Sequence, residues 1–329
     1  MTLINGIDID NITYYKNDEK SAIENNEPIE EKLHVIIVVS NPCLYAKRYI
    51  LMKEFIKRIE LEEKNVILYI VELAYKNQKF IITDKNNKQH LQLQTDCPLW
   101  HKENMINLGV KYLLPDNYKA FAWIDADIEF ENNTWALDTL KILNGTRDIV
   151  QLFSHVVDMD KNRLTMSVFN SAGYQYAKQK KYCDSGENLW HPGYAWAITR
   201  KAYEKIGGLY ELAIVGEGDI IMLKCLLKKG IDYDKINYNE DYINSVVEYE
   251  KKMENLKFGY VPGVVRHHYH GSKKNRFYVE RKSILVKHQF SPYTHISHDD
   301  IGIIIPTQNF SEEFKQDVYN YFKSRNEDE

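Results

Sequence analysis

The chain has 329 residues, of which 44% are hydrophobic and 27% are charged, and its formal net charge at pH 7 is −4. This length and composition allow a substantial core, in one large domain or in two closely packed ones. The small negative charge argues against nucleic acid as the main partner, because non-specific binding to nucleic acid needs a strongly positive surface.

Alternating strands and helices predict the first half of a doubly wound sheet. We expect a strand over 34–40, a helix over 45–60, a strand over 65–73, a hairpin over 79–94 with its turn at 84–87, a helix over 99–114 and a strand over 121–124. The second half is less regular, with a strand over 148–157, a strand over 194–199 and helices that end at Gly207-Gly208 or cover 219–229 and 241–256.

The ends of the chain differ from this central part. Residues 1–33 form a polar extension, residues 34–290 form one domain with halves 34–147 and 148–290, and residues 291–329 form a tail with a short helix. The polar N-terminus does not resemble a signal peptide. The longest apolar runs are far shorter than the roughly 18 residues that span a bilayer. The four cysteines lack zinc-binding spacing. We therefore expect a soluble, cytoplasmic protein without a transmembrane segment.

The most informative motif is FAWIDADIEF, residues 121–130, in which an apolar run leads directly into Asp125 and Asp127. Open α/β sheets bind ligands outside the carboxyl ends of such strands. A divalent cation with a phosphate behind it is the simplest occupant for two carboxylates there. The alternative is an Asp-rich turn that only closes the strand. Three other aspartate pairs lack the apolar run, and we interpret them as ordinary surface or turn residues: Asp8/Asp10, Asp158/Asp160 and Asp232/Asp234.

Several short blocks together resemble a known family. DADIEF after an apolar strand, Gly-Tyr-Ala-Trp, GGLYE, GEGD at a helix start and VVRHHYHG occur in the order found in GT-A-fold glycosyltransferases. The chain resembles most the clan of β-1,4-galactosyltransferases and polypeptide N-acetylgalactosaminyltransferases, and uncharacterised soluble glycosyltransferases of microbes and large viruses. The resemblance covers residues 34–290. It implies an α/β, Rossmann-like GT-A fold: a mixed, mainly parallel sheet flanked by helices, with a nucleotide-binding half (34–147) and an acceptor half (148–290).

The resemblance also implies a metal site. Asp127 would ligate Mn²⁺ or Mg²⁺, and Asp125 would contact the ribose of the donor or the metal through water. A late histidine would complete the site, and the family pattern fits His267 best. On an extended chain His267 and His270 point to opposite faces, so joint ligation by both requires a turn in the backbone. The sequence leaves open which of the two binds metal.

The GEGD block carries the candidate general base. In inverting transfer a carboxylate takes the proton of the acceptor hydroxyl group, and the family has Gly-Glu-Asp-Asp at this helix start. This chain has Gly218 there instead, so the base is either Asp219 or Glu217, and inversion is a less firm expectation. The alternative for Asp219 is a helix N-cap.

Other positions match the family's binding regions. Glu72, Lys102 and Asn107 are candidates to contact the nucleotide, and the basic run Lys273, Lys274 and Arg276 is a candidate to meet the diphosphate, unless it is a solvated loop. Sugar contacts are expected from one Pro/Gly loop, whose aromatic faces can stack on sugars; the equal alternative for these rings is ordinary packing. The candidate residues are Trp190, His191, Gly193 and Tyr194.

The implied activity is metal-dependent transfer of a hexosyl or N-acetylhexosaminyl group from a nucleotide sugar, a UDP-sugar, to a hydroxyl group of a glycan, glycoprotein or other acceptor. Two other classes remain. A sugar-phosphate nucleotidyltransferase should have a glycine-rich loop after the first strand, where this chain has SNPCLY. A non-catalytic carbohydrate-binding protein would explain the 24 tyrosines and 5 tryptophans, but not the ordered motifs.

Overall fold

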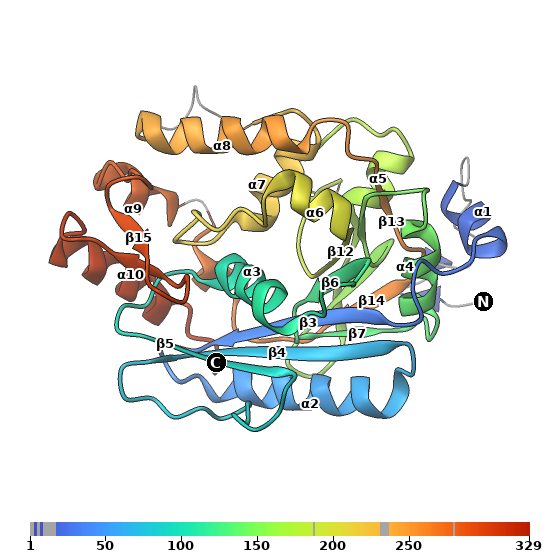
Figure 1. Ribbon diagram of the computed structural model, residues 1–329, viewed down its shortest axis with the longest axis horizontal. Coiled ribbons are helices and arrows are strands. Elements are labelled where there is room, and N and C mark those ends of the chain that lie inside the picture. The colour runs from blue at the N-terminus through green and yellow to red at the C-terminus, as the bar shows by residue number, and fades with distance from the viewer. Residues whose placement is uncertain (1–2, 5–6, 9–17, 187, 231–236, 279) are drawn as a thin grey trace.

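The computed structural model describes residues 3–4, 7–8, 18–186, 188–230, 237–278 and 280–329. Its centre is a seven-stranded sheet in the order β13-β8-β12-β6-β3-β4-β5 (Figure 1). β12 runs against both of its neighbours and the other pairs are parallel. This mixed, mainly parallel sheet confirms the predicted α/β class. Its strands are β3 (Leu33–Ser40), β4 (Val66–Tyr75), β5 (His90–Thr95), β6 (Ala120–Ile124), β8 (Ile149–Gln151), β12 (Ala195–Thr199) and β13 (Phe258–Tyr260).

Helices cover both faces of this sheet. α2 (Ala46–Glu62) and α4 (Trp135–Leu143) pack on one face, while α3 (Lys102–Leu113), α6 (Arg200–Ile206), α7 (Gly218–Leu226) and α8 (Glu240–Met253) lie over the other (Figure 1). In β6, Phe121 and Trp123 pack into the core on the α3 side, and Ala122 and Ile124 pack into the opposite core. A strand buried on both faces needs a continuous apolar run, which is why residues 121–124 are apolar throughout.

A second, five-stranded sheet has the order β11-β10-β9-β14-β7. Its strands are β7 (Ile128–Phe130), β9 (His155–Met159), β10 (Thr165–Ser171), β11 (Trp190–His191) and β14 (Val264–His267). β14 pairs antiparallel with β7 and parallel with β9, so that His267 lies opposite Ile128 on one side and Asp158 on the other. This sheet brings a late segment of the chain beside the turn that follows β6.

The predicted hairpin over 79–94 is wrong. β5 runs parallel to β4, and residues 79–83 form a loop. The carboxylate of Glu72 explains the difference, because it accepts hydrogen bonds from the backbone amides of Ile81, Ile82 and Thr83. These amides therefore satisfy the buried side-chain oxygens of Glu72 and do not pair with a neighbouring strand.

The predicted strand over 148–157 is divided in two. β8 belongs to the seven-stranded sheet and β9 to the five-stranded sheet, with a break at residues 152–154. Within the break, the Leu152 amide donates to Ala195 O, whereas the Ser154 amide donates to Gly263 O. The chain passes from one sheet to the other here, and an apolar run cannot reveal such a change of partner.

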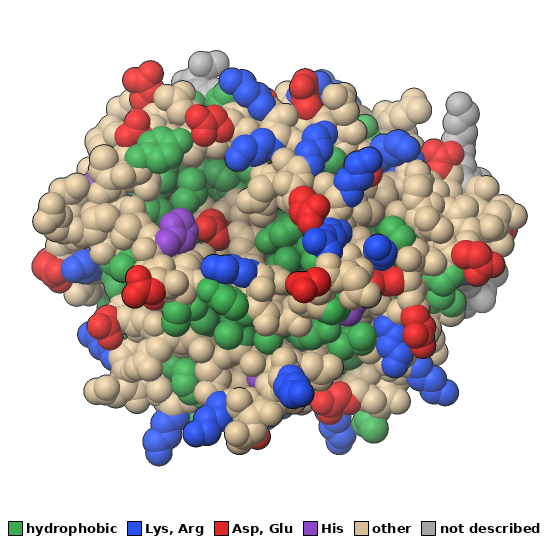
Figure 2. All heavy atoms as spheres, in the orientation of Figure 1, with side chains coloured by type: hydrophobic (Ala, Val, Ile, Leu, Met, Phe, Trp, Pro, Cys, Tyr) green, Lys and Arg blue, Asp and Glu red, His purple; other side chains and the backbone are tan. Residues whose placement is uncertain are grey.

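Both ends of the chain pack against this core. The N-terminal elements are β1 (Leu3–Ile4), β2 (Ile7–Asp8) and α1 (Asp18–Asn25), and Arg147 binds both Asp18 and Glu19. The remaining elements are α5 (Ala172–Ala177), η1 (Lys273–Arg276), α9 (Lys282–Lys287), β15 (Ile296–His298), β16 (Ile304–Pro306) and α10 (Glu312–Ser324). Figure 2 shows acidic and basic side chains intermingled on one face, in keeping with the small net charge. Within the described part of the chain, no helix has the length and apolarity to cross a bilayer.

Glu327 fixes the C-terminal segment. Its Oε1 accepts hydrogen bonds from Arg325 Nε at 2.7 Å and Arg48 Nη2 at 2.8 Å, and Arg276 Nη1 lies 3.4 Å away. Burial alone would raise the pKa of Glu327, but the surrounding guanidinium groups outweigh it and hold the pKa well below its usual range. This ionised carboxylate joins α2, η1 and the C-terminus.

Glu327→Gln should therefore destabilise the protein, because it leaves buried guanidinium groups without their counter-charge. Breaking a buried ion pair on one side costs roughly 3–5 kcal/mol, which should lower the melting temperature by several degrees in calorimetry. Glu329→Gln is the matched control, because Glu329 is exposed. If both variants had the same melting temperature as the wild type, this interpretation of the Glu327 cluster would be wrong.

Candidate active site

The candidate site lies where the order of the seven-stranded sheet reverses. From β3 the chain continues to β4 and β5 on one side, and β6 lies on the other side of β3. The connections that leave the carboxyl ends of β3 and β6 therefore lead in opposite directions, and such a switch point is where open α/β sheets bind ligands. Asp125 directly follows β6, and its backbone amide donates to Tyr194 O at 2.7 Å. The Asp-x-Asp segment thus lies at the expected position.

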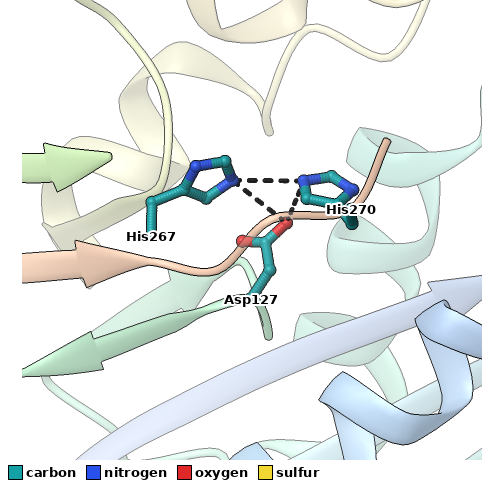
Figure 3. A group of neighbouring side chains, drawn as sticks. All are labelled: Asp127, His267 and His270. Carbon is teal, nitrogen blue, oxygen red and sulfur yellow. Dashed lines mark hydrogen bonds and ion pairs between the residues drawn. The ribbon is translucent and has the colours of Figure 1, made fainter. Parts of the chain in front are cut away.

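Three side chains converge beyond this point: Asp127, His267 and His270 point toward one another (Figure 3). Asp127 Oδ2 lies 2.9 Å from His270 Nε2 and 3.7 Å from His267 Nε2, and the two Nε2 atoms are 3.1 Å apart. Neighbouring ligands of one divalent cation, each at about 2.1 Å from it, have separations of this size. The turn after β14 brings the two histidines together, with the His268 amide donating to Asp127 O.

His267 has the surroundings of a metal ligand. Its Nδ1 lies 2.6 Å from Asp158 Oδ1, in the neighbouring strand β9. Burial opposes its protonation, but Asp127 and Asp158 raise the pKa of His267 to about 9. A carboxylate on Nδ1 holds the ring in the tautomer that leaves Nε2 toward the metal, as is common for metal-binding histidines. Because Asp158 is almost fully buried, this support is rigid.

His270 is held differently. Its Nδ1 lies 2.6 Å from Arg276 Nη2, and a guanidinium can only donate hydrogen bonds. Nδ1 therefore accepts, and the proton of the neutral ring lies on Nε2, facing Asp127 Oδ2. Burial, with Arg276 nearby, lowers the pKa of His270 to about 4. Ligation requires the Nε2 proton to leave in both rings. Asp158 stabilises the remaining Nδ1 proton of His267, whereas Arg276 opposes a proton on Nδ1 of His270, so His267 is the better oriented of the two ligands.

The donor set fits a divalent cation. Asp127 Oδ1 is buried and has no hydrogen-bond partner among the described residues, which is costly for a carboxylate oxygen unless a ligand satisfies it. Burial would raise the pKa of Asp127, but His270 and His267 hold it well below its usual range. One carboxylate and two imidazoles suit Mn²⁺, Zn²⁺ and Fe²⁺, and suit Mg²⁺, which prefers oxygen ligands, less well.

Asp125 lies outside this cluster and forms an ion pair with Lys102, at the start of α3. Burial disfavours the charged amine, but Asp125 and its acidic neighbours raise the pKa of Lys102 above its usual range. Lys102 therefore stays positively charged beside the Asp-x-Asp segment. It is the one predicted nucleotide-contacting residue of α3 that faces the site.

The two acidic residues of GEGD point to different places. Asp219, in the first turn of α7, lines a pocket together with Lys102 and Gly193. Glu217 is buried, has a φ of 86°, and pairs with Arg281 at 3.5 Å and Lys282 at 3.3 Å. Glu217 is the residue before the helix, but its side chain forms no capping hydrogen bond. Asp219 is therefore not the N-cap, which removes the alternative interpretation of this residue.

Aromatic rings connect the pocket with the candidate metal cluster, because Tyr194 lines the pocket and also contacts His267. The rings of His191 and Tyr194 stack with centroids 4.3 Å apart, and Tyr194 contacts His267 with centroids 4.7 Å apart. Burial lowers the pKa of His191 to about 3, so this ring is neutral. Tyr194 has a φ of 78°, a strained conformation for a non-glycine residue that often marks a functional site. Gly193 packs against Asp219 Oδ2, where a side chain would cover this oxygen.

Three predicted contact residues have other roles in the structure. Both oxygens of Glu72 are engaged by the 81–83 loop. Asn107 donates to Leu209 O and Glu211 and accepts from the Leu209 amide and Tyr203. Trp190 is buried and packs against Tyr182. Since their polar atoms or faces are used within the fold, we leave these residues out of the candidate site.

The basic run after β14 divides in the same way. Lys273 forms an ion pair with Asp158 and remains half exposed. Lys274 is exposed. Arg276 is buried between Glu327 and His270, so its guanidinium already has partners. Only Lys273 and Lys274 are therefore accessible to an incoming diphosphate.

Sequence reasoning missed two residues of the site, Asp158 and Glu103. Asp158 belongs to a pair that we interpreted as a surface turn, but it is buried behind His267. Glu103 follows Lys102 and lines the same pocket as Asp219. The position of Asp158 inside the mainly apolar strand β9 and that of Glu103 in the first turn of α3 were the available signals, and both also fit ordinary structural roles.

No protein-family model and no curated protein sequence matches the chain. Among solved structures, it is similar to the catalytic domain of Drosophila β1,4-galactosyltransferase 7 in complex with xylobiose, at 10% identity over 84% of this chain and 93% of that one, with a TM-score of 0.39. It is also similar to the mannosyltransferase PcManGT from Pyrobaculum calidifontis in complex with GDP-Man and Mn²⁺, at 12% identity over 93% and 78%, with a TM-score of 0.43.

A third similar structure is a putative glucose-1-phosphate thymidylyltransferase from Bacillus anthracis in complex with sucrose, at 9% identity over 71% of this chain and 88% of that one, with a TM-score of 0.37. The similar structures thus include two glycosyltransferases and one nucleotidyltransferase. All three TM-scores lie below 0.5, so the functional argument rests on the residues of the site.

Asp127→Asn should abolish the binding of Mn²⁺ without unfolding the protein, because it removes the only carboxylate of the cluster and changes no core volume. Calorimetric titration with Mn²⁺ measures the loss, and the melting temperature reports the fold. Asp116→Asn, in the exposed turn after α3, is the control. Wild-type affinity in the Asp127 variant would show that the metal binds elsewhere.

The two histidines should differ in their effect on metal affinity. His267→Ala removes the ligand that Asp158 holds in place, and we expect a larger loss of Mn²⁺ affinity than in His270→Ala. Asp158→Asn should weaken binding by about 10- to 100-fold, as expected for a residue that orients a ligand. If His270→Ala has the larger effect, Arg276 releases His270 on metal binding and the assignment is reversed.

Proposed function

We propose that this protein is a metal-dependent glycosyltransferase, which moves a sugar from a nucleotide sugar to an acceptor hydroxyl group. The observation that carries the proposal is the arrangement of Asp127, His267 and His270 at the switch point of the sheet, next to a pocket that contains Asp219. A metal ion can stabilise the departing diphosphate, and a separate carboxylate can remove the proton of the acceptor hydroxyl group.

Each residue has a defined task in this proposal. Asp127 and His267 would hold a divalent cation, which supplies the positive charge that the diphosphate leaving group needs. Lys102 and Lys273 add positive charge at the same end of the site. Asp219 takes the proton of the acceptor hydroxyl group as its oxygen bonds to the anomeric carbon, while the bond from that carbon to the diphosphate breaks. This assignment implies inversion at the anomeric carbon.

We infer the identity of the donor and the acceptor from the family resemblance and from the chemistry of the reaction, and not from contacts with a bound substrate. The family resemblance favours a UDP-linked hexose or N-acetylhexosamine as donor, with Mn²⁺ as the metal. The acceptor is a hydroxyl compound such as a glycan or glycoprotein. A panel of UDP- and GDP-sugars with Mn²⁺ tests the class: release of nucleoside diphosphate supports a glycosyltransferase, pyrophosphate exchange indicates a nucleotidyltransferase, and binding without turnover indicates a carbohydrate-binding protein.

Asp219→Asn should reduce transfer at least about 100-fold, because asparagine cannot accept the proton and a general base contributes about 10²- to 10⁴-fold to rate. Donor affinity and melting temperature should stay normal, since Asp219 bonds only the adjacent Ile220 amide among the described residues. Glu217→Gln is the comparison: it loosens the pairs with Arg281 and Lys282 and should act mainly on stability. If transfer survives in the Asp219 variant and is lost in the Glu217 variant, Glu217 is the base.

A further inference from the structure

Glu103 is a buried acidic residue whose carboxylate has no side-chain hydrogen-bond partner among the described residues. It lies in the first turn of α3 and is 7% exposed. Among the described residues, no other side chain forms a hydrogen bond or a close ion pair with its carboxylate, which lines the pocket of Asp219. The backbone amide of Glu103 itself is a hydrogen-bond partner of this carboxylate, which leaves part of the hydrogen-bonding capacity of a buried carboxyl group unused. Its presence in a pocket therefore points to a ligand that satisfies it.

Gly218 makes room for this carboxyl group. A methyl group at position 218 would collide with the carboxyl carbon and Oε1 of Glu103. The φ of Gly218 is not in the left-handed region, so the backbone alone does not require glycine there. Close approach of Glu103 to α7 is thus the physical reason for a glycine at the start of this helix.

The pocket has the size and lining for one polar group of a larger molecule. Its free space is about 10 Å³, the room for one water molecule or one hydroxyl group. Trp123, Trp196 and Met222 form apolar walls, whereas Lys102 and Asp219 are partly exposed. A sugar at the mouth of the pocket could insert a single hydroxyl group.

The charges around Glu103 determine its protonation. Burial raises the pKa of Glu103 to about 7, Lys102 opposes this shift, and Asp219 and the more distant Asp125 reinforce it. Tyr249 of α8 also lies close enough to be affected by its charge. A carboxyl group that retains its proton near neutral pH can donate one hydrogen bond and accept another, as a hydroxyl group requires.

We propose that Glu103 is a substrate-binding residue whose carboxyl group holds one hydroxyl group of the sugar substrate beside Asp219. The inference rests on the proposed function and extends it, because it assigns recognition of an uncharged sugar to a residue of α3. The bound hydroxyl group belongs either to the donor sugar or to the acceptor sugar. A carboxylated sugar at this position is disfavoured, since it would place a third acidic group next to Glu103 and Asp219.

The binding test uses UDP, a panel of UDP-sugars and a panel of methyl glycosides as acceptors, all with Mn²⁺. Glu103→Leu removes the hydrogen-bonding group at similar size, and Gly218→Ala displaces it without removing it. Both should leave UDP affinity unchanged and weaken either UDP-sugar affinity or the acceptor KM about fivefold, the effect of one hydrogen bond. Glu103→Gln should retain binding. Lys111→Gln, at the exposed end of α3, is the control.

Deoxy substrates identify the hydroxyl group. A substrate without the bound hydroxyl group should lose about the same fivefold factor with the wild type and nothing further with Glu103→Leu, because the interaction is already absent. A loss confined to UDP-sugars assigns the pocket to the donor, and a loss confined to glycosides assigns it to the acceptor. If Glu103→Leu and Gly218→Ala bind every substrate as the wild type does, the inference is overturned.

A stability measurement tests the proton without activity. Glu103 has a folded-state pKa of about 7 and an ordinary value of 4.5. Between these values the folded state binds a proton that the unfolded state does not, so this group makes the wild type less stable as pH rises from about 4.5 to about 7. Above pH 7 its effect is constant. The melting temperature of Glu103→Gln minus that of the wild type should therefore rise across this window and then level off.

A flat difference across this window would show that Glu103 is ionised throughout, which contradicts its proposed role as a hydrogen-bond donor. Different results would overturn the proposed function and the role of Glu103. If the wild type binds no UDP with Mn²⁺ and releases none from the panel, the proposed function fails and the inference falls with it. If UDP binds and is released but the Glu103 and Gly218 variants discriminate sugars as the wild type does, only the inference fails.

Discussion

The pairing of β14 between β7 and β9 is the constraint on which the candidate site depends. This register sets His267 opposite Ile128, the residue after Asp127, and opposite Asp158 on the other side. Two candidate metal ligands that are 140 residues apart in the chain, Asp127 and His267, are thereby brought together by backbone hydrogen bonds. A shift of the strand register by one residue would turn His267 to the other face of the sheet. The candidate metal cluster therefore forms only with the observed register.

A line of charges connects this cluster with the C-terminus. Glu327 binds Arg276, and Arg276 in turn donates to His270, whose Nε2 faces Asp127. The C-terminal segment thus takes part in the site, although it contributes no residue to the cluster. Asp158 has the corresponding position behind His267. Each histidine is therefore oriented by a group of opposite character, a carboxylate for His267 and a guanidinium for His270, and this difference separates two residues that look equivalent in the sequence.

The sequence alone predicted the features that depend on the local pattern of residues. The apolar run at 121–124 marked a strand buried on both faces, and the carboxylates after it marked the switch point. Long-range pairing could not be predicted from local pattern. The predicted hairpin at 79–94 is wrong because Glu72 accepts hydrogen bonds from the loop amides. Asp158 contacts His267 only because of the register between β9 and β14. Glu103 was hidden for a similar reason, since its importance depends on contact with Gly218, far along the chain. Local periodicity predicts elements, whereas charges that meet across elements require the fold.

The most direct measurement is a crystal structure with Mn²⁺ and UDP, with data collected at a wavelength where manganese scatters anomalously. Our account predicts one anomalous peak within about 2.3 Å of Asp127 Oδ and His267 Nε2, with the diphosphate bound to the same ion on the side of Lys102. Asp158 should remain on Nδ1 of His267. An anomalous peak elsewhere, or a diphosphate bound away from Asp127, would contradict the central claim that this sheet register builds a metal site for a nucleotide.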